Sequence, residues 1–487
     1  MKIGTDNLKI LLQFFILIAC AIALARLVPS FLDWVKVSGV NFSFAQKDIV
    51  GDYFTAFIWA FVLGFTILLW PVSFQDKRAL LVLWLIKIFI TLGFMLYYEG
   101  HYGLDAYNYF YHGLRYSFAW EEFEFGAGTQ NMGNIASLHQ YIIPNSYHAI
   151  KVSCAMIGMV AVYIFYRAIC MFWRRDDVRI FYVLALFPSI LFWSSILGKD
   201  PLMLVGVALY AYAVVGWQQF ARMHYLLWGA LGVWLAAFIR FWYAPILLAP
   251  LAVFIIIQSG SFYFKVIFIV IVATAFLFSW SMFAEKLSIE STQDLVSQTD
   301  TISSGWGHGG SGNQISGGIT SIGGMLAFMP IGSFAALFRP IPGEILNPFG
   351  MLAGLENLVL LFLFILAIKR TQWTEIKEEP LLLWAIVTVI VWATIYGFVS
   401  YQNLGSAARF KLQILPILLA LLVYLARDRN KLSRPQETDI FPMVFLPSSG
   451  PKPKPSTISR IIHASRFKVK SKKRYYWKWK RVNELNR

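Results

Sequence analysis

Long apolar stretches recur along the whole chain and are separated by short polar connections. A hydrocarbon core of roughly 30 Å needs about 20 apolar residues in a helix, and most of these stretches approach that length. The strict alternation of apolar and polar positions that a membrane β-barrel requires is missing. The pattern therefore predicts an all-α polytopic membrane protein with about 12 transmembrane helices. Their predicted bounds are 10–29, 53–72, 79–98, 149–172, 180–197, 201–220, 224–239, 241–257, 264–283, 350–368, 380–399 and 411–427.

Composition excludes an ordinary soluble domain. Of the 487 residues, 58% are hydrophobic and only 14% are charged, and the mean hydropathy is +0.60. Cys20, Cys154 and Cys170 all lie inside apolar stretches without metal-ligand spacing, so we interpret them as small core residues. The first apolar run is longer than a signal peptide and lacks a cleavage site, which favours a retained span.

The connections between spans differ in charge, and this difference predicts their side. Those rich in Lys and Arg belong in the cytoplasm by the positive-inside rule. They are 75–78, 173–179, 221–224 and 368–379. An even number of spans then returns both termini to the cytoplasm. The predicted outer segments are 30–52, 99–148 and 284–349, although Lys36, Lys47 and Lys151 depart from the rule.

The last outer segment contains a loop that is rich in glycine. Residues 303–324 include nine glycines, which is typical of a mobile loop. The apolar run that follows is short and is interrupted by Pro330 and Gly332, so we expect an interfacial or re-entrant helix there. Residues 1–427 thus form the predicted transmembrane domain.

Residues 428–487 form a basic cytoplasmic tail with a Pro-rich linker. This tail has 16 Lys and Arg against 4 Asp and Glu, and so carries +12 of the chain's net charge of +16. Its end mixes cations with Tyr475, Tyr476, Trp477 and Trp479, which suits anionic lipids. Because the tail follows a span, lipid headgroups are favoured over nucleic acid. The alternative is a solvated tail without a dedicated partner.

A sparse set of ionisable residues lies at the predicted outer ends of the spans. Charges beside lipid are costly, so a set gathered at one face is a candidate functional site. Its members are Asp105, Lys199, Asp200, Arg240, Arg339, Glu344, Arg409 and Lys411.

Asp105 follows a glycine turn in the first large outer loop and precedes Tyr107, Tyr109 and Tyr111. A carboxylate at the membrane rim can act as general base toward a sugar hydroxyl within hydrogen-bond reach. The alternative is that Asp105 only caps a short helix.

Lys199, Asp200 and Arg240 fall in very short outer hairpins, which place them near the membrane boundary. Cations there can hold the phosphate of a lipid-linked substrate through charge-assisted hydrogen bonds. The alternatives are a local pair between Lys199 and Asp200, and an Arg240 side chain that only snorkels to the interface.

Arg339 and Glu344 precede the span at 350–368, and Arg409 and Lys411 stand at the start of the last span. Two cations close to lipid favour an anionic partner. The alternatives are a structural pair between Arg339 and Glu344 and a solvated helix end at Arg409 and Lys411.

Signatures of other chemistries are missing from the sequence, which contains no HExxH, GxSxG, P-loop or CxxC pattern. Several histidines fall in outer segments, but without ligand spacing, so a divalent metal is compatible with the chain and unsupported by it. They are His101, His112, His139, His148 and His308.

Short motifs resemble a known class of membrane enzymes. DAYNY at 105–109, ARFKLQILPIL at 408–418 and the many spans look like polyprenol-dependent glycosyltransferases of the GT-C type. PSILFWSSILGKD, IRFWYAPILL and RPIPGEILNPFGMLAGLE also resemble a branch of bacterial membrane proteins associated with surface polysaccharide synthesis.

The resemblance implies that Asp105 orients or deprotonates the acceptor. It also implies a sugar donor on polyprenyl phosphate or diphosphate, which enters from the outer leaflet of the bacterial inner membrane. The chain departs from the common GT-C pattern because no second acid is adjacent to Asp105; Glu121, Glu122 and Glu124 are farther along. We therefore expect transfer of a sugar to a glycan or lipid acceptor, with the outer cations binding the phosphate.

Other functions also fit a many-span protein with charged outer ends. A polysaccharide polymerase of the flippase-dependent pathway would use similar groups and differ only in its product. A lipid or solute transporter would place ionisable groups near the midplane and show repeated halves, and neither feature is evident in the sequence. A noncatalytic assembly subunit is the remaining alternative.

Overall fold

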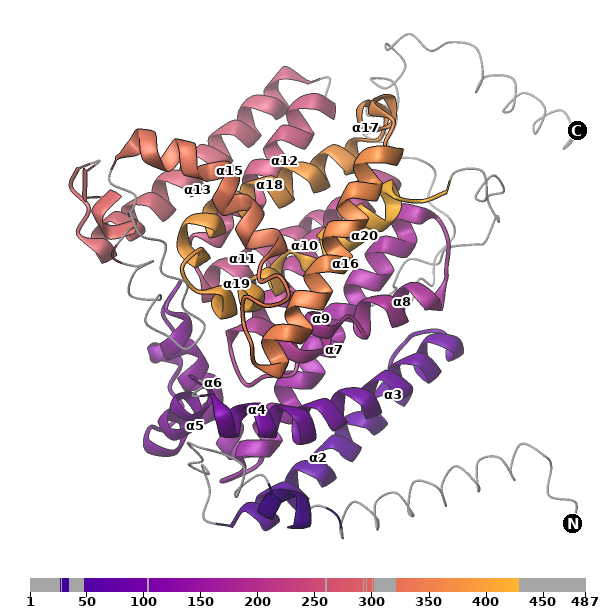
Figure 1. The fold of residues 1–487 in the computed structure, drawn as a ribbon, viewed down its shortest axis with the longest axis vertical. Coiled ribbons are helices and arrows are strands. Elements are labelled where there is room, and N and C mark those ends of the chain that lie inside the picture. The colour runs from indigo at the N-terminus through magenta and orange to yellow at the C-terminus, as the bar shows by residue number, and fades with distance from the viewer. Residues whose placement is uncertain are drawn as a thin grey trace, which may run out of the picture.

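The fold is helical throughout the part of the chain that the computed structural model describes (Figure 1). Nearly all of the predicted first span, most of the glycine-rich loop and nearly all of the basic tail lie outside these residues. The described residues are 27, 29–34, 48–102, 105–258, 261–291, 293–294, 296–299, 301 and 321–428.

Seven described helices are long and apolar enough to cross a membrane, so the prediction of an all-α membrane protein is confirmed. The number rises to eight if the bent pair Leu404–Gln413 and Leu415–Leu425 forms one span, and nearly all of the predicted first span lies outside the described residues, so the number of about 12 stays a prediction. Four of the seven are single helices: Ile49–Leu69 (α2), Tyr147–Trp173 (α7), Lys199–Phe220 (α10) and Pro348–Arg370 (α16). Two are the apolar parts of longer helices, Phe262–Glu285 in α13 (Phe262–Leu287) and Pro380–Phe398 in α18 (Pro380–Ser400). The last, Phe74–His101, runs through α3 (Phe74–Phe89), η1 (Ile90–Phe94) and α4 (Met95–His101).

The remaining described helices are shorter. Three of them are apolar and have 10–17 residues: α11 (His224–Ile239), α12 (Tyr243–Gln258) and α15 (Ile322–Phe338). The others are α5 (Asp105–Arg115), η2 (Trp120–Glu122), α6 (Gly128–Ile142), α8 (Val178–Ala185), α9 (Pro188–Trp193), α17 (Trp373–Glu378), α19 (Leu404–Phe410), η3 (Lys411–Gln413) and α20 (Leu415–Leu425).

Side-chain caps fix where several helices begin. The side chains of Asp48, Ser73, Ser146, Asn347 and Asn403 accept backbone N–H groups from the first turns of α2, α3, α7, α16 and α19. Such caps satisfy amides that have no partner within the helix, which matters most where water is scarce.

Helices α7 and α10 form the centre of the bundle, since 83% of the most apolar window of each is buried. Helix α10 packs closely on α11 because glycines face each other. A Cβ atom on Gly232 would lie 2.6 Å from the carbonyl oxygen of Gly206, closer than any side chain tolerates. Small residues permit this approach in the absence of a hydrophobic force between helices.

The span predicted at 180–197 is broken. The structure divides it into α8 and α9, because Pro188 ends the first helical run and starts the second. The chain then turns through the largely buried residues 194–198 before α10 begins. Non-helical backbone at this depth is tolerated where protein surrounds it.

The span predicted at 411–427 is also different in the structure. It begins earlier, at α19, and bends by 76° before α20, which has Pro416 in its first turn. The apolar run before residue 339, predicted as an interfacial or re-entrant helix, forms the continuous helix α15, which packs on α18 with Gly332 against Gly397.

Helices α5 and α6 lie together at one end of the molecule, beside the lower end of α7 (Figure 1). Their shared apolar core contains Tyr109, Phe110, Met132 and Tyr147. Gly113 permits the contact, because a Cβ atom there would lie 2.8 Å from the backbone of Ala136. This packing sets the position of Asp105 at the start of α5.

Candidate functional site

Arg409 and Asp200 form an ion pair although 209 residues separate them in the chain. Nε and Nη2 of Arg409 each lie 2.8 Å from Oδ2 of Asp200. The Asp200 side chain is fully buried, and the Arg409 side chain is 18% exposed. Asp200 is the second residue of α10, where the helix dipole favours a carboxylate. The pair therefore fixes one side of the guanidinium group and leaves its edge accessible.

Asp105 lies at the exposed side of this pair. Its Oδ2 is 3.9 Å from Nη1 of Arg409, and its side chain is 62% exposed. Its place in the first turn of α5 also suits a carboxylate, so a helix-terminal role and a contact with Arg409 occur together. Asp105 is thus a solvent-accessible acid beside a fixed cation.

Arg240 follows the last residue of α11 and is held by aromatic side chains. Its guanidinium carbon lies 4.6 Å from the ring centroid of Phe410 and 5.8 Å from that of Trp242. Nη1 donates to the hydroxyl of Tyr396 at 3.2 Å. These contacts hold the cation in place, so Arg240 does more than snorkel to an interface.

Lys199 connects the amino-terminal end of α10 to α6. Its ammonium group donates to Oγ1 of Thr129 at 2.7 Å, while Asp200 binds Arg409 instead. The alternative of a local pair between Lys199 and Asp200 is therefore wrong. Four charged side chains lie within electrostatic range of the Lys199 ammonium group: Arg240, Asp105, Arg409 and Asp200.

Tyr109 is a member of the site to which the sequence gave no role. It is 1% exposed, and its hydroxyl has no hydrogen-bond partner among the described residues. Burial raises the pKa of Tyr109, and the nearby Asp105 carboxylate raises it further. The available signal was the spacing from Asp105, because residues four apart share a helix face.

Six side chains from four parts of the chain thus meet at one end of the bundle, and we call them the Arg409 cluster. They hold three cations, two carboxylates and one hydroxyl group. The members of the Arg409 cluster are Asp105, Tyr109, Lys199, Asp200, Arg240 and Arg409.

Arg339 and Glu344, also predicted for this site, pair with each other. Nε of Arg339 lies 2.7 Å from Oε1 of Glu344, and Oε2 accepts the N–H of Ile341 at 2.7 Å. Within the described residues no polar contact joins this pair to the Arg409 cluster. The two side chains therefore stabilise the turn before α16, as the structural alternative expects.

Lys411 lies two residues from Arg409 but is buried elsewhere. It is 1% exposed, and its ammonium group donates to Oδ1 of Asn357 on α16. The alternative of a solvated helix end is therefore wrong for this residue. The short helix η3 turns Lys411 away from the Arg409 cluster and toward α16.

A cavity of about 160 Å³ lies beside the Arg409 cluster, between α4, α9, α16 and α19. Trp193 connects the two, because it lines the cavity and its ring centroid is 5.7 Å from the guanidinium carbon of Arg409. Glu356 also lines the cavity; its Oε2 accepts the N–H of Ser189 at 2.6 Å, and its Oε1 has no partner among the described residues.

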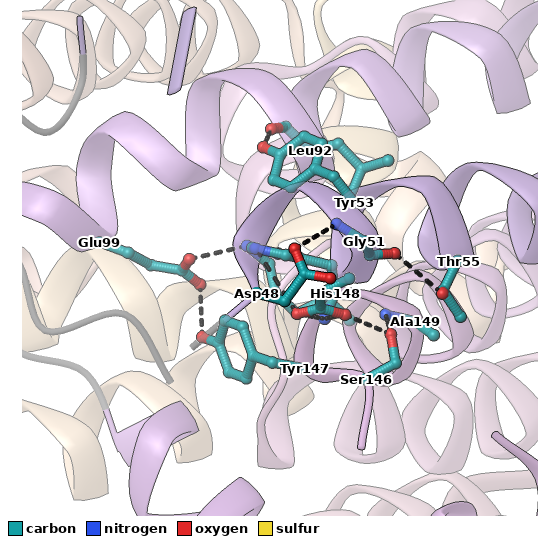
Figure 2. A network of polar contacts seen from close by, with 12 residues as sticks. Asp48, Gly51, Tyr53, Thr55, Leu92, Glu99, Ser146, Tyr147, His148 and Ala149 are labelled. Carbon is teal, nitrogen blue, oxygen red and sulfur yellow. Dashed lines mark hydrogen bonds and ion pairs between the residues drawn. The ribbon is translucent and has the colours of Figure 1, made fainter. Parts of the chain in front are cut away.

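A second polar network is buried where α2, α4 and α7 meet (Figure 2). Lys151 and Glu99 form an ion pair at 2.7 Å with neither side chain exposed, and the hydroxyl of Tyr147 donates to Glu99 at 2.9 Å. This pair explains why Lys151 departs from the positive-inside rule. The ring of Tyr147 stacks on that of Tyr107 at 4.9 Å, so the network supports α5.

The remaining predictions concern a metal and the family. No three His, Cys, Asp or Glu side chains of the described residues are arranged to hold a metal ion, and His308 lies outside those residues. Comparisons with protein-family models, curated proteins and solved structures gave no match. The glycosyltransferase resemblance thus depends on the motifs of this chain alone.

Proposed function

We propose that the protein is a membrane glycosyltransferase that moves a sugar from a polyprenyl phosphate or diphosphate donor to a hydroxyl group of a glycan or lipid acceptor. The Arg409 cluster is the observation that carries the proposal. It combines a solvent-accessible carboxylate with cations whose positions are fixed by other parts of the fold. This arrangement suits an anionic leaving group next to a base.

The cations of the cluster bind the donor phosphate. Arg240 and Arg409 offer guanidinium edges that match phosphate oxygens, and Lys199 adds an ammonium group that Thr129 holds at the same site. Asp200 holds the Arg409 guanidinium in place and offsets part of its charge. With two carboxylates and three cations, the Arg409 cluster carries one formal net positive charge, which a phosphate neutralises.

The transfer step needs one base and one stabilised leaving group. The oxygen of the acceptor hydroxyl attacks the anomeric carbon of the sugar, and its proton moves to the carboxylate of Asp105. The bond between the anomeric carbon and the phosphate oxygen breaks, and its electron pair stays on that oxygen. Arg240, Arg409 and Lys199 stabilise the charge that develops there.

The placement of the reaction follows from the distribution of charge in the sequence. The connections rich in Lys and Arg assign the cytoplasmic side, so the Arg409 cluster faces the outer side of a bacterial inner membrane, and both termini are cytoplasmic. The basic tail then binds the anionic lipids of the inner leaflet.

Radiolabelled transfer in proteoliposomes tests the proposal. We expect the wild-type protein to move labelled sugar from a polyprenyl-linked donor to an acceptor, and Asp105→Asn to abolish transfer without loss of expression. Glu121→Gln is the matched control, because Glu121 is an exposed acid of the same loop. Full transfer by Asp105→Asn would remove the base, and uptake of the unreacted donor by the wild type would indicate a transporter. A ladder of products in place of one added sugar would indicate a polymerase.

A further inference from the structure

The cavity beside the Arg409 cluster has aromatic walls and one free carboxylate oxygen. Tyr98 and Phe349 meet edge to face, with ring centroids 4.7 Å apart. Phe94 and Phe192 also pack against Phe349, at 5.1 and 6.1 Å. Glu356 is 5% exposed and lines the same cavity, with its Oε1 unpartnered among the described residues.

The free oxygen of Glu356 requires an occupant that donates hydrogen bonds. A buried acceptor without a partner is costly, and a carboxylate is the most demanding acceptor among side chains. A prenyl chain would fit the aromatic walls but would leave Oε1 unsatisfied. Water alone would satisfy Oε1 but would gain little from the rings of Phe94, Tyr98, Phe192 and Phe349.

The charge around Glu356 favours a neutral occupant. The ammonium group of Lys411 lies within electrostatic range of the Glu356 carboxylate, and the backbone N–H of Ser189 binds its other oxygen. A cationic ligand would therefore compete with a lysine that is already present. Hydroxyl groups need no such exchange.

A sugar ring meets all three conditions. Its hydroxyl groups donate to a carboxylate, its C–H groups pack against the negative faces of aromatic rings, and it is neutral. A cavity of about 160 Å³ has space for one small ring or for several water molecules.

We propose that this cavity holds the sugar ring of the donor, with a hydroxyl group donating to Oε1 of Glu356 and a ring face against Tyr98 or Phe349. Because Trp193 lines the cavity and also contacts Arg409, the anomeric carbon faces the Arg409 cluster, where the phosphate binds. The inference rests on the proposed function and assigns the site of its sugar.

Binding of methyl pyranosides tests the inference without any transfer. Saturation-transfer difference NMR on the full-length protein in lipid nanodiscs can compare the methyl pyranosides of glucose, galactose and mannose with tetramethylammonium and farnesol. We expect at least one pyranoside to bind and the two other probes not to displace it. Glu356→Gln and Phe349→Leu should each weaken binding about tenfold, whereas Glu378→Gln, an exposed acid on α17, should leave it unchanged.

Several results would overturn the assignment. They are an absence of pyranoside binding, equal binding by the wild type and both cavity variants, and displacement of the pyranoside by tetramethylammonium or farnesol. The outcome is separable from that for the proposed function. Pyranoside binding together with failed transfer would retain the sugar site and remove the transferase, and successful transfer without dependence on Glu356 would do the reverse.

Discussion

Replacement of Asp200 by Asn removes the charge that holds Arg409 and keeps the shape of the side chain. Asp200 is fully buried, and both of its contacts with Arg409 measure 2.8 Å. Removal of one partner from a buried ion pair costs about 3–5 kcal/mol, because the other charge is left without compensation. Arg409 is 18% exposed and can be hydrated in part. We therefore expect a loss near the low end of that range, about 3 kcal/mol.

A double-mutant cycle isolates the pair from other effects of each substitution. The free energy of unfolding can be measured by titration with sodium dodecyl sulfate in mixed micelles, for Asp200→Asn, Arg409→Gln and the double variant. We expect a coupling energy of at least about 1 kcal/mol. Asp177 and Arg179 provide the control, because this pair also has a 2.8 Å contact but the Arg179 side chain is 75% exposed. Its cycle should show no measurable coupling.

The reasoning would be refuted if the two cycles gave the same coupling energy. It would also be refuted if Asp200→Asn had no effect on stability, since the buried carboxylate would then not need Arg409. In either case the fixed position of the guanidinium group, on which the phosphate site depends, would lose its structural cause.

Three further predictions concern the fold. Gly232→Leu should prevent close contact with Gly206 and abolish the monodisperse peak in fluorescence-detected chromatography. Lys151→Met or Glu99→Gln alone should each lower the free energy of unfolding by about 3–5 kcal/mol, whereas the double variant should regain most of that loss. A double variant that is as destabilised as the single variants would contradict this prediction. Burial lowers the pKa of His139 to about 4, so its contribution to stability is complete above pH 6.5 and falls as the pH drops toward 4. Between pH 7 and 5 we expect the free energy of unfolding to fall by about 2 kcal/mol. The melting temperature should therefore decrease over this pH range in the wild type but not in His139→Gln.

The sequence predicts the positions of the helices better than the positions where helices break or bend. The span predicted at 224–239 has the bounds that the structure gives α11. Hydropathy alone missed the break at Pro188, because a proline in an apolar run is compatible with a kinked helix as well as with two helices. It also missed the 76° bend before α20, which brings Arg409 to the amino-terminal end of α10.

The members of the candidate site were predicted in part, but their partners were not. Their places at the predicted ends of apolar spans mark Lys199, Asp200, Arg240 and Arg409 as unusual, because charges are costly beside lipid. Nothing in one sequence indicates that Asp200 meets Arg409, since 209 residues separate them. Pairing across such a distance depends on how whole helices pack.

The buried partners of Lys151 and Lys411 were also beyond prediction from the sequence. Each lysine lies at a predicted span end; the sequence marks Lys151 only as a departure from the positive-inside rule and offers Lys411 a solvated end or an anionic partner. The structure places Lys151 against Glu99 and Lys411 against Asn357, both on other helices. Buried charges of this kind are predictable as unusual, whereas their partners follow only from the fold.

Binding of a prenyl phosphate tests the central claim most directly. Farnesyl phosphate and farnesol differ only by the phosphate group, so their affinities for the protein in nanodiscs measure what the Arg409 cluster contributes. We predict that the wild type binds farnesyl phosphate at least tenfold more tightly than farnesol, and that Arg240→Gln removes most of this difference. Equal affinities for the two ligands in the wild type, or an Arg240→Gln variant that keeps the full difference, would contradict the account.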